Sequence, residues 1–249
     1  MYVVNFHPRI FDESLSEDEK KKMTEEGLIG GELKNLVVIV RKSSGEPKIN
    51  IDKRVIDTIP LSRKWTTKGY MEEVVNFACS QENINPSQWE ISILSSIGAE
   101  RFGGKENEVG GGEMGKSTGS AIYLALLSAL HQKPISKQIA ATGALAMKET
   151  KRIFDAQEIN LPKGTNLPIG GLRKKVFAAA EKGVNRLVLS KYNTSPNILA
   201  KKFKHSPSWR KIFDDYQTIV PSAIREKMTT YFAKNVKEMR ELFLEGKLS

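Results

Sequence analysis

One segment of the chain has a spacing that can hold a phosphate group. Residues 110–117 have the sequence GGGEMGKS, which matches the pattern G-x-x-x-x-G-K-[ST]. In proteins that use this pattern, backbone N–H groups of the loop surround the phosphates, the lysine contacts them and the hydroxyl binds magnesium. Lys116 and Ser117 would take these two roles, and the chemistry would be hydrolysis of a nucleoside triphosphate.

Two features that such a phosphate site needs are missing from the sequence. The loop should follow directly on a buried strand, but the residues before it are Lys105–Val109, with the sequence KENEV. A second apolar strand should end in an acid that holds magnesium, whereas LVVIV is followed by Arg41 and RLVL by Ser190. We therefore rank nucleotide hydrolysis below the two other functions that the rest of the sequence suggests.

A second motif gives the same serine a distant partner. Residues 168–175 have the sequence PIGGLRKK, and VFAAAEKGVNRLVLSKYN follows. This stretch resembles the proteolytic domain of Lon proteases, in which PIGGL-x-x-K opens a helix. Upstream, GKSTGSAIYLALLSALHQKPISKQIAATGALAMK is similar to the Lon stretch in which G-P-S-A-G opens an apolar helix and a later strand contains a Thr-Gly pair. The resemblance covers residues 30–225, and both motifs occur in the family's order.

The resemblance implies a Ser-Lys dyad, with Ser117 as the nucleophile and Lys175 as the general base. In the Lon pattern the base is the third residue after the leucine, which selects Lys175 among three adjacent cations. Arg173 is excluded in any case, because a guanidinium does not deprotonate at a relevant pH. Lys174 then stands where Lon proteases commonly have an acid.

The remaining site expectations also follow from the resemblance. Thr142 matches the threonine that supports the base lysine through a hydrogen bond, with an ordinary strand threonine as the alternative. Gly115 and Lys116 precede the nucleophile and are expected to support it, although Lon proteases usually have proline where Lys116 stands. The alternative role of Ser117 is that of a helix N-cap, which is compatible with the first.

The dyad requires that Lys175 be neutral when it accepts the proton of the serine hydroxyl. A serine hydroxyl is a poor nucleophile until a base takes its proton, and a lysine is a base only when it is neutral. Its pKa must fall from ~10.4 to about 7–8. Burial and neighbouring cations both lower it, and the sequence supplies apolar neighbours (Leu172, Val176) and cationic ones (Arg173, Lys174).

The elements that must position these residues alternate between helix and strand, which predicts an α/β (α+β) class. By resemblance the fold is the Lon proteolytic fold, related to a ribosomal-protein-type two-layer fold. The hydrophobic pattern predicts two strands within 28–51, separated by a Ser-Ser-Gly turn. Further helices are expected at Ser14–Lys22, Lys68–Ser80, Ser117–Leu130, Leu172–Lys182 and Ser222–Glu245, and further strands at Trp89–Leu94, Ile139–Met147, Arg186–Leu189 and Gln217–Val220.

The expected organisation is one domain with additions at both ends. Residues 1–29 are predicted to form an N-terminal arm and residues 30–225 the Lon-like proteolytic domain. Residues 149–165 lengthen the segment between the two motifs beyond that of Lon proteases, and we expect a surface insertion near the site. Residues 226–249 are expected to form a C-terminal helix that packs on the domain or extends it.

Composition limits the function classes. The 249 residues include 39% hydrophobic side chains and carry a formal charge of +10, which favours acidic partners and nucleic acid. The single cysteine, Cys79, excludes an internal disulfide framework and a thiolate zinc cluster. The three histidines lie in unrelated contexts, so a Ser-His triad has no support. No signal peptide or membrane span is expected, and the predicted location is the cytoplasm.

Together these patterns favour a Lon-like serine endopeptidase that acts on polypeptides without a cofactor. Nothing in the sequence resembles the ATPase module of Lon proteases, so the chain is expected to act without ATP or with a separate ATPase or scaffold partner. The resemblance also implies a homo-oligomeric ring, commonly a hexamer. The alternative is a catalytically silent Lon-like scaffold that binds nucleic acid through its basic surface.

Overall fold

The computed structural model describes residues 2–6, 31–45, 48–51, 61–96, 116–147, 150–154, 157–169, 172–194 and 215–249. Within these ranges, seven strands form one mixed sheet in the order β11-β10-β5-β1-β2-β4-β3. Strands β11, β10, β5 and β1 run parallel to one another. β2 pairs antiparallel with both β1 and β4, and β3 runs parallel to β4. The strands are β1 (Tyr2–Phe6), β2 (Gly31–Lys42), β3 (Lys48–Ile51), β4 (Trp89–Ser96), β5 (Ile139–Ala141), β10 (Arg186–Ser190) and β11 (Thr229–Ala233).

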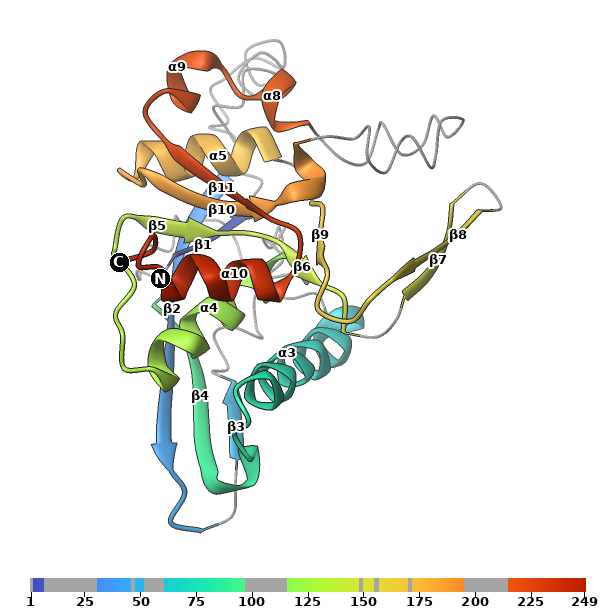
Figure 1. The fold of residues 1–249 in the computed structure, drawn as a ribbon, viewed down its shortest axis with the longest axis vertical. Helices are drawn as coiled ribbons and strands as arrows, with labels where there is room; N and C mark the ends of the chain where they lie inside the picture. The colour runs from blue at the N-terminus through green and yellow to red at the C-terminus, as the bar shows by residue number, and fades with distance from the viewer. Residues whose placement is uncertain are drawn as a thin grey trace.

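Helices cover the two faces of this sheet and produce two apolar cores. The alternation of side chains along β10 divides it between them, because Val188 joins one core while Leu187 and Leu189 join the other. The first core contains α3 (Leu61–Gln81), α4 (Gly119–Leu130) and α10 (Val236–Leu244), and the second contains α5 (Leu172–Glu181) and α8 (Tyr216–Ile219) (Figure 1). Short helical turns complete the described chain: η1 (Pro86–Gln88), η2 (Lys116–Thr118), η3 (Lys191–Asn193) and α9 (Ser222–Arg225).

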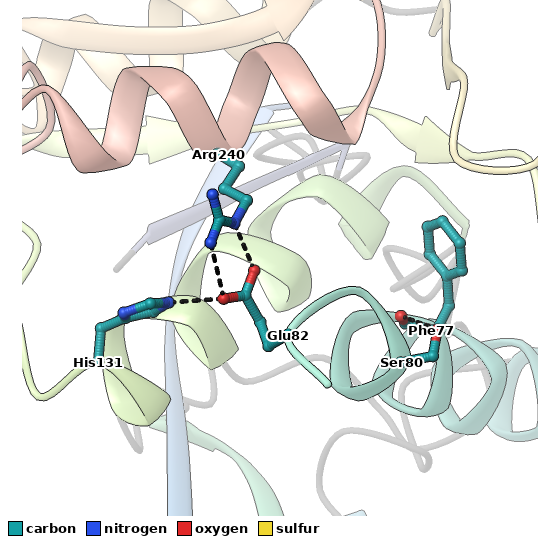
Figure 2. A network of polar contacts seen from close by, with 5 residues as sticks. All are labelled: Phe77, Ser80, Glu82, His131 and Arg240. Carbon is teal, nitrogen blue, oxygen red and sulfur yellow. Dashed lines mark hydrogen bonds and ion pairs between the residues drawn. The ribbon is translucent and has the colours of Figure 1, made fainter. Parts of the chain in front are cut away.

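A polar clasp joins three helices at the edge of the first core. Glu82, just after α3, accepts hydrogen bonds from Arg240 of α10 at 2.6 and 3.2 Å and lies 2.8 Å from Nε2 of His131, at the end of α4 (Figure 2). Burial acts to raise the pKa of Glu82, but the hydrogen bonds and charges of Arg240 and His131 together hold it below its ordinary value. The clasp therefore connects α10, the last described helix, to the ends of α3 and α4.

Two small sheets stand apart from the main one. β6 (Ala144–Leu145) pairs antiparallel with β9 (Asn166–Leu167), next to the end of β5. β7 (Thr150–Phe154) and β8 (Gln157–Leu161) form an antiparallel hairpin that projects away from the body of the molecule (Figure 1). The hairpin lies within the segment 149–165 that the sequence analysis expects to be an insertion.

Most expected elements are confirmed, namely the helices at 68–80, 117–130 and 172–182 and the strands at 89–94 and 186–189. The two strands expected within 28–51 are also present, but β4 lies between them. The strand expected at Ile139–Met147 is broken into β5 and β6 at Thr142 and Gly143. The helix expected at Ser14–Lys22 lies outside the described residues.

Three expectations for the chain ends were wrong. The arm expected at residues 1–29 contains β1, which lies inside the sheet between β5 and β2. The strand expected at Gln217–Val220 is helix α8, because the Asp215 carboxylate caps the N–H of Gln217 at 2.9 Å. The single helix expected at Ser222–Glu245 is interrupted by β11, whose Thr, Tyr and Phe residues favour a strand and pair with β10.

Candidate functional site

Ser117 lies in η2, immediately before the first turn of α4, and its side chain is partly buried. The helix that follows is apolar on all sides, and its first nine residues are buried, which holds this turn firmly against the protein interior. The carbonyl oxygen of Ser117 accepts a hydrogen bond from the N–H of Gly143 at 2.8 Å and from the Thr142 hydroxyl at 3.5 Å. The backbone of the candidate nucleophile is thus attached to the break between β5 and β6.

Thr142 and Gly143 form this break because the backbone of Thr142 still binds the main sheet, whereas that of Gly143 binds the turn before α4 and the start of α4. The N–H of Thr142 continues the main sheet by donating to the carbonyl of Val188 at 3.1 Å. Gly143 then leaves the sheet, and its N–H and carbonyl bind the carbonyl of Ser117 and the N–H of Ser120 at 2.8 and 3.0 Å. The Thr-Gly pair therefore joins the sheet to the turn that contains the candidate nucleophile.

Lys175 reaches the same place from the opposite face of the sheet. It lies in the first turn of α5, is only 5% exposed, and its Nζ donates to the Thr142 hydroxyl oxygen at 3.4 Å. The Thr142 hydroxyl can accept this bond and donate its own proton to the Ser117 carbonyl at the same time. Burial lowers the pKa of Lys175 from 10.5 to about 8.

The structure thus brings three predicted site residues together, with Thr142 between Ser117 and Lys175. Gly115 lies outside the described residues, as does the side chain of Lys116, whose backbone belongs to η2. His131 lies in the clasp with Glu82, and the other two histidines lie outside the described residues. In the part of the chain that the structure describes, no three His, Cys, Asp or Glu side chains gather as metal ligands.

Sequence reasoning missed three polar residues around the site. Tyr70 of α3 accepts a hydrogen bond from the N–H of Leu145 at 2.7 Å, and a side chain on Gly119 would collide with its hydroxyl. Ser120 and Asn166 are both completely buried and hydrogen-bonded to each other at 2.9 Å. A serine early in an otherwise apolar helix was a signal for Ser120, but neither of the others belongs to a pattern.

The part of the chain that forms the candidate site is similar to known proteins. Residues 111–204 match the family model of the Lon protease (S16) C-terminal proteolytic domain. Over 134 residues, 54% of this chain, it is 28% identical to Lon protease 2 of Thermus thermophilus. It is 30% identical over 128 residues, 51% of the chain, to Lon protease 2 of Hydrogenovibrio crunogenus, and 27% identical over 162 residues, 61% of the chain, to the Lon protease of Magnetococcus marinus.

The matches cover a small part of these relatives, since the chain spans 12%, 11% and 16% of their respective lengths. The matched region includes the turn before α4, the Thr-Gly break and the start of α5, which are the elements that meet at the site. No described helix is long and apolar enough to cross a membrane. The α/β fold agrees with these matches, and the region of the chain that forms the candidate site is similar to the proteolytic domain of Lon proteases.

Proposed function

We propose that this protein is a serine peptidase in which Ser117 is the nucleophile and Lys175 the general base. The observation that carries the proposal is the burial of Lys175 on Thr142, whose hydroxyl also contacts the backbone of Ser117. A solvated lysine would remain charged at neutral pH, whereas a pKa of about 8 leaves roughly a tenth of Lys175 neutral at pH 7. That fraction supplies the base.

The reaction would proceed through an acyl-enzyme. The Ser117 oxygen bonds to the peptide carbonyl carbon while its proton passes to neutral Lys175. The C–N bond then breaks, and Lys175 gives the proton to the departing amine. Water next attacks the ester, and Ser117 recovers its hydroxyl proton as the carboxylic acid product leaves. Backbone N–H groups at the start of α4 are suited to stabilise the developing oxyanion.

The proposal extends to how the domain receives its substrate. Ring assembly, as the family resemblance implies, would enclose the site and restrict it to flexible or unfolded polypeptides. An unfoldase or scaffold on a separate chain is the proposed partner that would deliver unfolded polypeptide to the site. These features are tested separately, by the mass of the native protein and by adding candidate ATPases to an activity assay.

Intact-mass spectrometry with a serine-reactive fluorophosphonate tests the dyad. We expect one adduct on the wild-type protein, none on Ser117→Ala or Lys175→Met, and retention of the adduct in Lys174→Met, the control lysine one residue away. The labelling rate should rise with pH through about 8 and level off above it, because only neutral Lys175 accepts the proton. No adduct between about pH 6 and 10, or an adduct on another residue, would refute the dyad.

A second candidate function is nucleic-acid binding, which the charge of +10 favours. It predicts a gel-shift affinity for DNA or RNA that falls steeply with salt and that Ser117→Ala leaves intact. The variant Lys116→Ala distinguishes nucleotide hydrolysis, the third hypothesis, from peptidase activity. This change would abolish nucleotide hydrolysis by a phosphate-binding loop, but should leave labelling of Ser117 at least partly in place.

A further inference from the structure

A buried polar pair lies directly behind the candidate site. Ser120, in the first turn of α4, and Asn166, in β9, are both fully buried, and their side chains lie 2.9 Å apart. Neither side chain contacts Ser117, Thr142 or Lys175 through a hydrogen bond in the described structure. The residue that they surround is Gly143.

The direction of the hydrogen bond between the pair follows from their other partners. The amide nitrogen of Asn166 donates to the carbonyl of Ala233, at the end of β11, at 3.0 Å. Its oxygen must therefore face Ser120, and since that oxygen only accepts, the Ser120 hydroxyl is the donor. The Ser120 hydroxyl has one proton, and it donates this proton to Asn166. The carbonyl oxygen of Gly143 lies 3.1 Å from the same hydroxyl, but it accepts its hydrogen bond from the Ser120 N–H at 3.0 Å.

The pair leaves no free space around Gly143. A Cβ atom on this glycine would collide with the Asn166 side-chain oxygen and come within 2.5 Å of the Ser120 hydroxyl. The main chain of Asn166 is fixed as well, since its N–H donates to Lys234 and its carbonyl accepts from Ser190 at 2.5 Å. The Gly143 peptide is thus pressed against the side chain of a residue in β9 that is hydrogen-bonded to β10 and to the end of β11.

Gly143 in turn determines where the site residues lie. Its N–H binds the Ser117 carbonyl, and its neighbour Thr142 contacts both Ser117 and Lys175. We propose that Ser120 and Asn166 are positioning residues that hold the Thr142–Gly143 segment at the spacing that Ser117 and Lys175 require. The inference rests on the proposed function, and it assigns to this pair a contribution to rate beyond its contribution to stability.

The test measures the rate of fluorophosphonate labelling of Ser117 in Ser120→Ala, Asn166→Leu and the double variant. Ser120→Ala is the main variant because alanine is favourable in a helix and the Ser120 N–H bond to Gly143 is kept. Ser128→Ala is the control, since it removes a hydroxyl that donates to Lys133 at 2.7 Å, two turns further along the same helix.

We expect Ser120→Ala and Asn166→Leu each to slow labelling at least about tenfold, and the double variant to be no slower than the slower single variant. Reversible affinity for a peptide should change little, and Ser128→Ala should label like the wild type. Melting temperature should fall, because each change leaves a buried hydrogen-bonding group without its partner, but the protein should stay folded at the labelling temperature. Normal labelling of Ser120→Ala overturns the inference, as does a loss no larger than the fall in folded fraction. Independent, additive losses in the two single variants also overturn it.

A second readout separates this inference from the dyad itself. The titration of Lys175 can be followed by NMR of its side-chain CH2 groups, assigned with Lys175→Met, whether or not Ser117 reacts. Loosening the Thr142–Gly143 segment admits water, so Ser120→Ala should move the midpoint upward, towards that of an exposed lysine. If the wild type is not labelled, the proposed function fails, and an unchanged midpoint would then overturn the inference as well.

Discussion

At the scale of single residues, Lys175 is a buried cation for which the described residues provide no counter-charge. Lys175 is 5% exposed and its described hydrogen bond is to a neutral hydroxyl. Burying an ammonium in this way is unfavourable, so the pKa of Lys175 falls and the neutral amine is favoured. The same property that would make Lys175 a base therefore lowers the stability of the fold.

Replacing Lys175 by methionine should accordingly stabilise the protein. The folded-state pKa of about 8 lies below the ordinary 10.5, so the unfolded chain binds more protons between these values. The wild type is thus penalised by about 3 kcal/mol below pH 8, and the penalty disappears as the pH rises towards 10.5. Urea unfolding of both proteins at several pH values measures this difference. Equal stabilities at pH 7 would contradict the burial of the ammonium.

At the scale of elements, the break between β5 and β6 determines the geometry of the site. A continuous strand would have kept the backbone of Thr142 and Gly143 in the sheet, whereas the break directs Gly143 towards Ser117 and Ser120. The sequence showed an apolar run here and predicted one strand. It could not show the break, because Gly143 is required by contacts with residues far away in sequence, chiefly Asn166.

Gly143→Ala tests the tightness of this break. The added methyl would overlap the Asn166 oxygen, so we expect a loss of about 1–3 kcal/mol in the free energy of unfolding and much slower Ser117 labelling. Gly69→Ala is the matched control, because its Cβ would meet nothing within 4 Å in the interior of α3. It should stabilise the protein by about 0.5–1 kcal/mol. Equal stability of the two variants would show that the space around Gly143 relaxes freely.

The clasp at Glu82 gives a second element-scale prediction. The pKa of Glu82 is lowered in the folded state, so its contribution to stability is present above the ordinary carboxyl pKa and is lost as the pH falls through the folded value. Glu82→Gln should lower stability by about 1 kcal/mol at pH 7, and the difference should shrink in acid. Glu245→Gln, in an exposed pair with Lys247, should change little. Thermal unfolding across pH decides, and a constant difference would contradict the charge contribution.

Elements with a local signal in the sequence were predicted correctly more often than elements without one. The helix at 117–130 and the strand at 186–189 are continuous apolar runs, and both were predicted. The C-terminal segment was assigned one helix because its apolar residues are frequent, although its own signals indicated otherwise. Asn235 caps Glu238 at 3.0 Å and the Glu238 carboxylate accepts from Lys234, which is a helix start in the middle of the expected helix.

Some residues of the candidate site were predicted from the sequence, and others were not. Ser117, Thr142 and Lys175 were predicted because family motifs mark them, and the structure brings them together. Tyr70 and Asn166 were not predicted, since their roles depend on contacts with Leu145, Ser120 and Ala233 that only the folded chain creates. A buried asparagine has no periodic neighbours in sequence to reveal it.

At the scale of the whole molecule, one sheet unites segments from both ends of the chain. β11 extends the sheet beside β10, and α10 packs its buried Met239 and Phe243 into the same core as α4. The last described residues are therefore part of the body that forms the site rather than an attachment to it. The formal charge of +10, summed over the whole chain, is a property at the same scale.

This charge predicts a salt-dependent preference among substrates. An acidic unfolded polypeptide should approach faster than a basic one of equal length, and the advantage should decline as salt screens charges beyond about 10 Å. The measurement is KM for matched acidic and basic peptides at low and high salt. We expect KM for the acidic peptide to rise with salt while kcat stays constant. If KM does not change with salt, the positive charge does not attract the peptide substrate and must serve another partner.

The place of β1 in the sheet has a consequence for how the protein is made. Tyr2 and Val3 pair with Ala140 and Ala141, so the central seam of the sheet closes only when the first strand meets residues synthesised far later. Contacts between such distant segments are formed late and slow down folding. Until β5 leaves the ribosome, β1 has only β2 as a neighbour, and its other edge stays open to wrong partners. A bulky tag fused directly before Tyr2 would be placed in the middle of the sheet rather than at a free end.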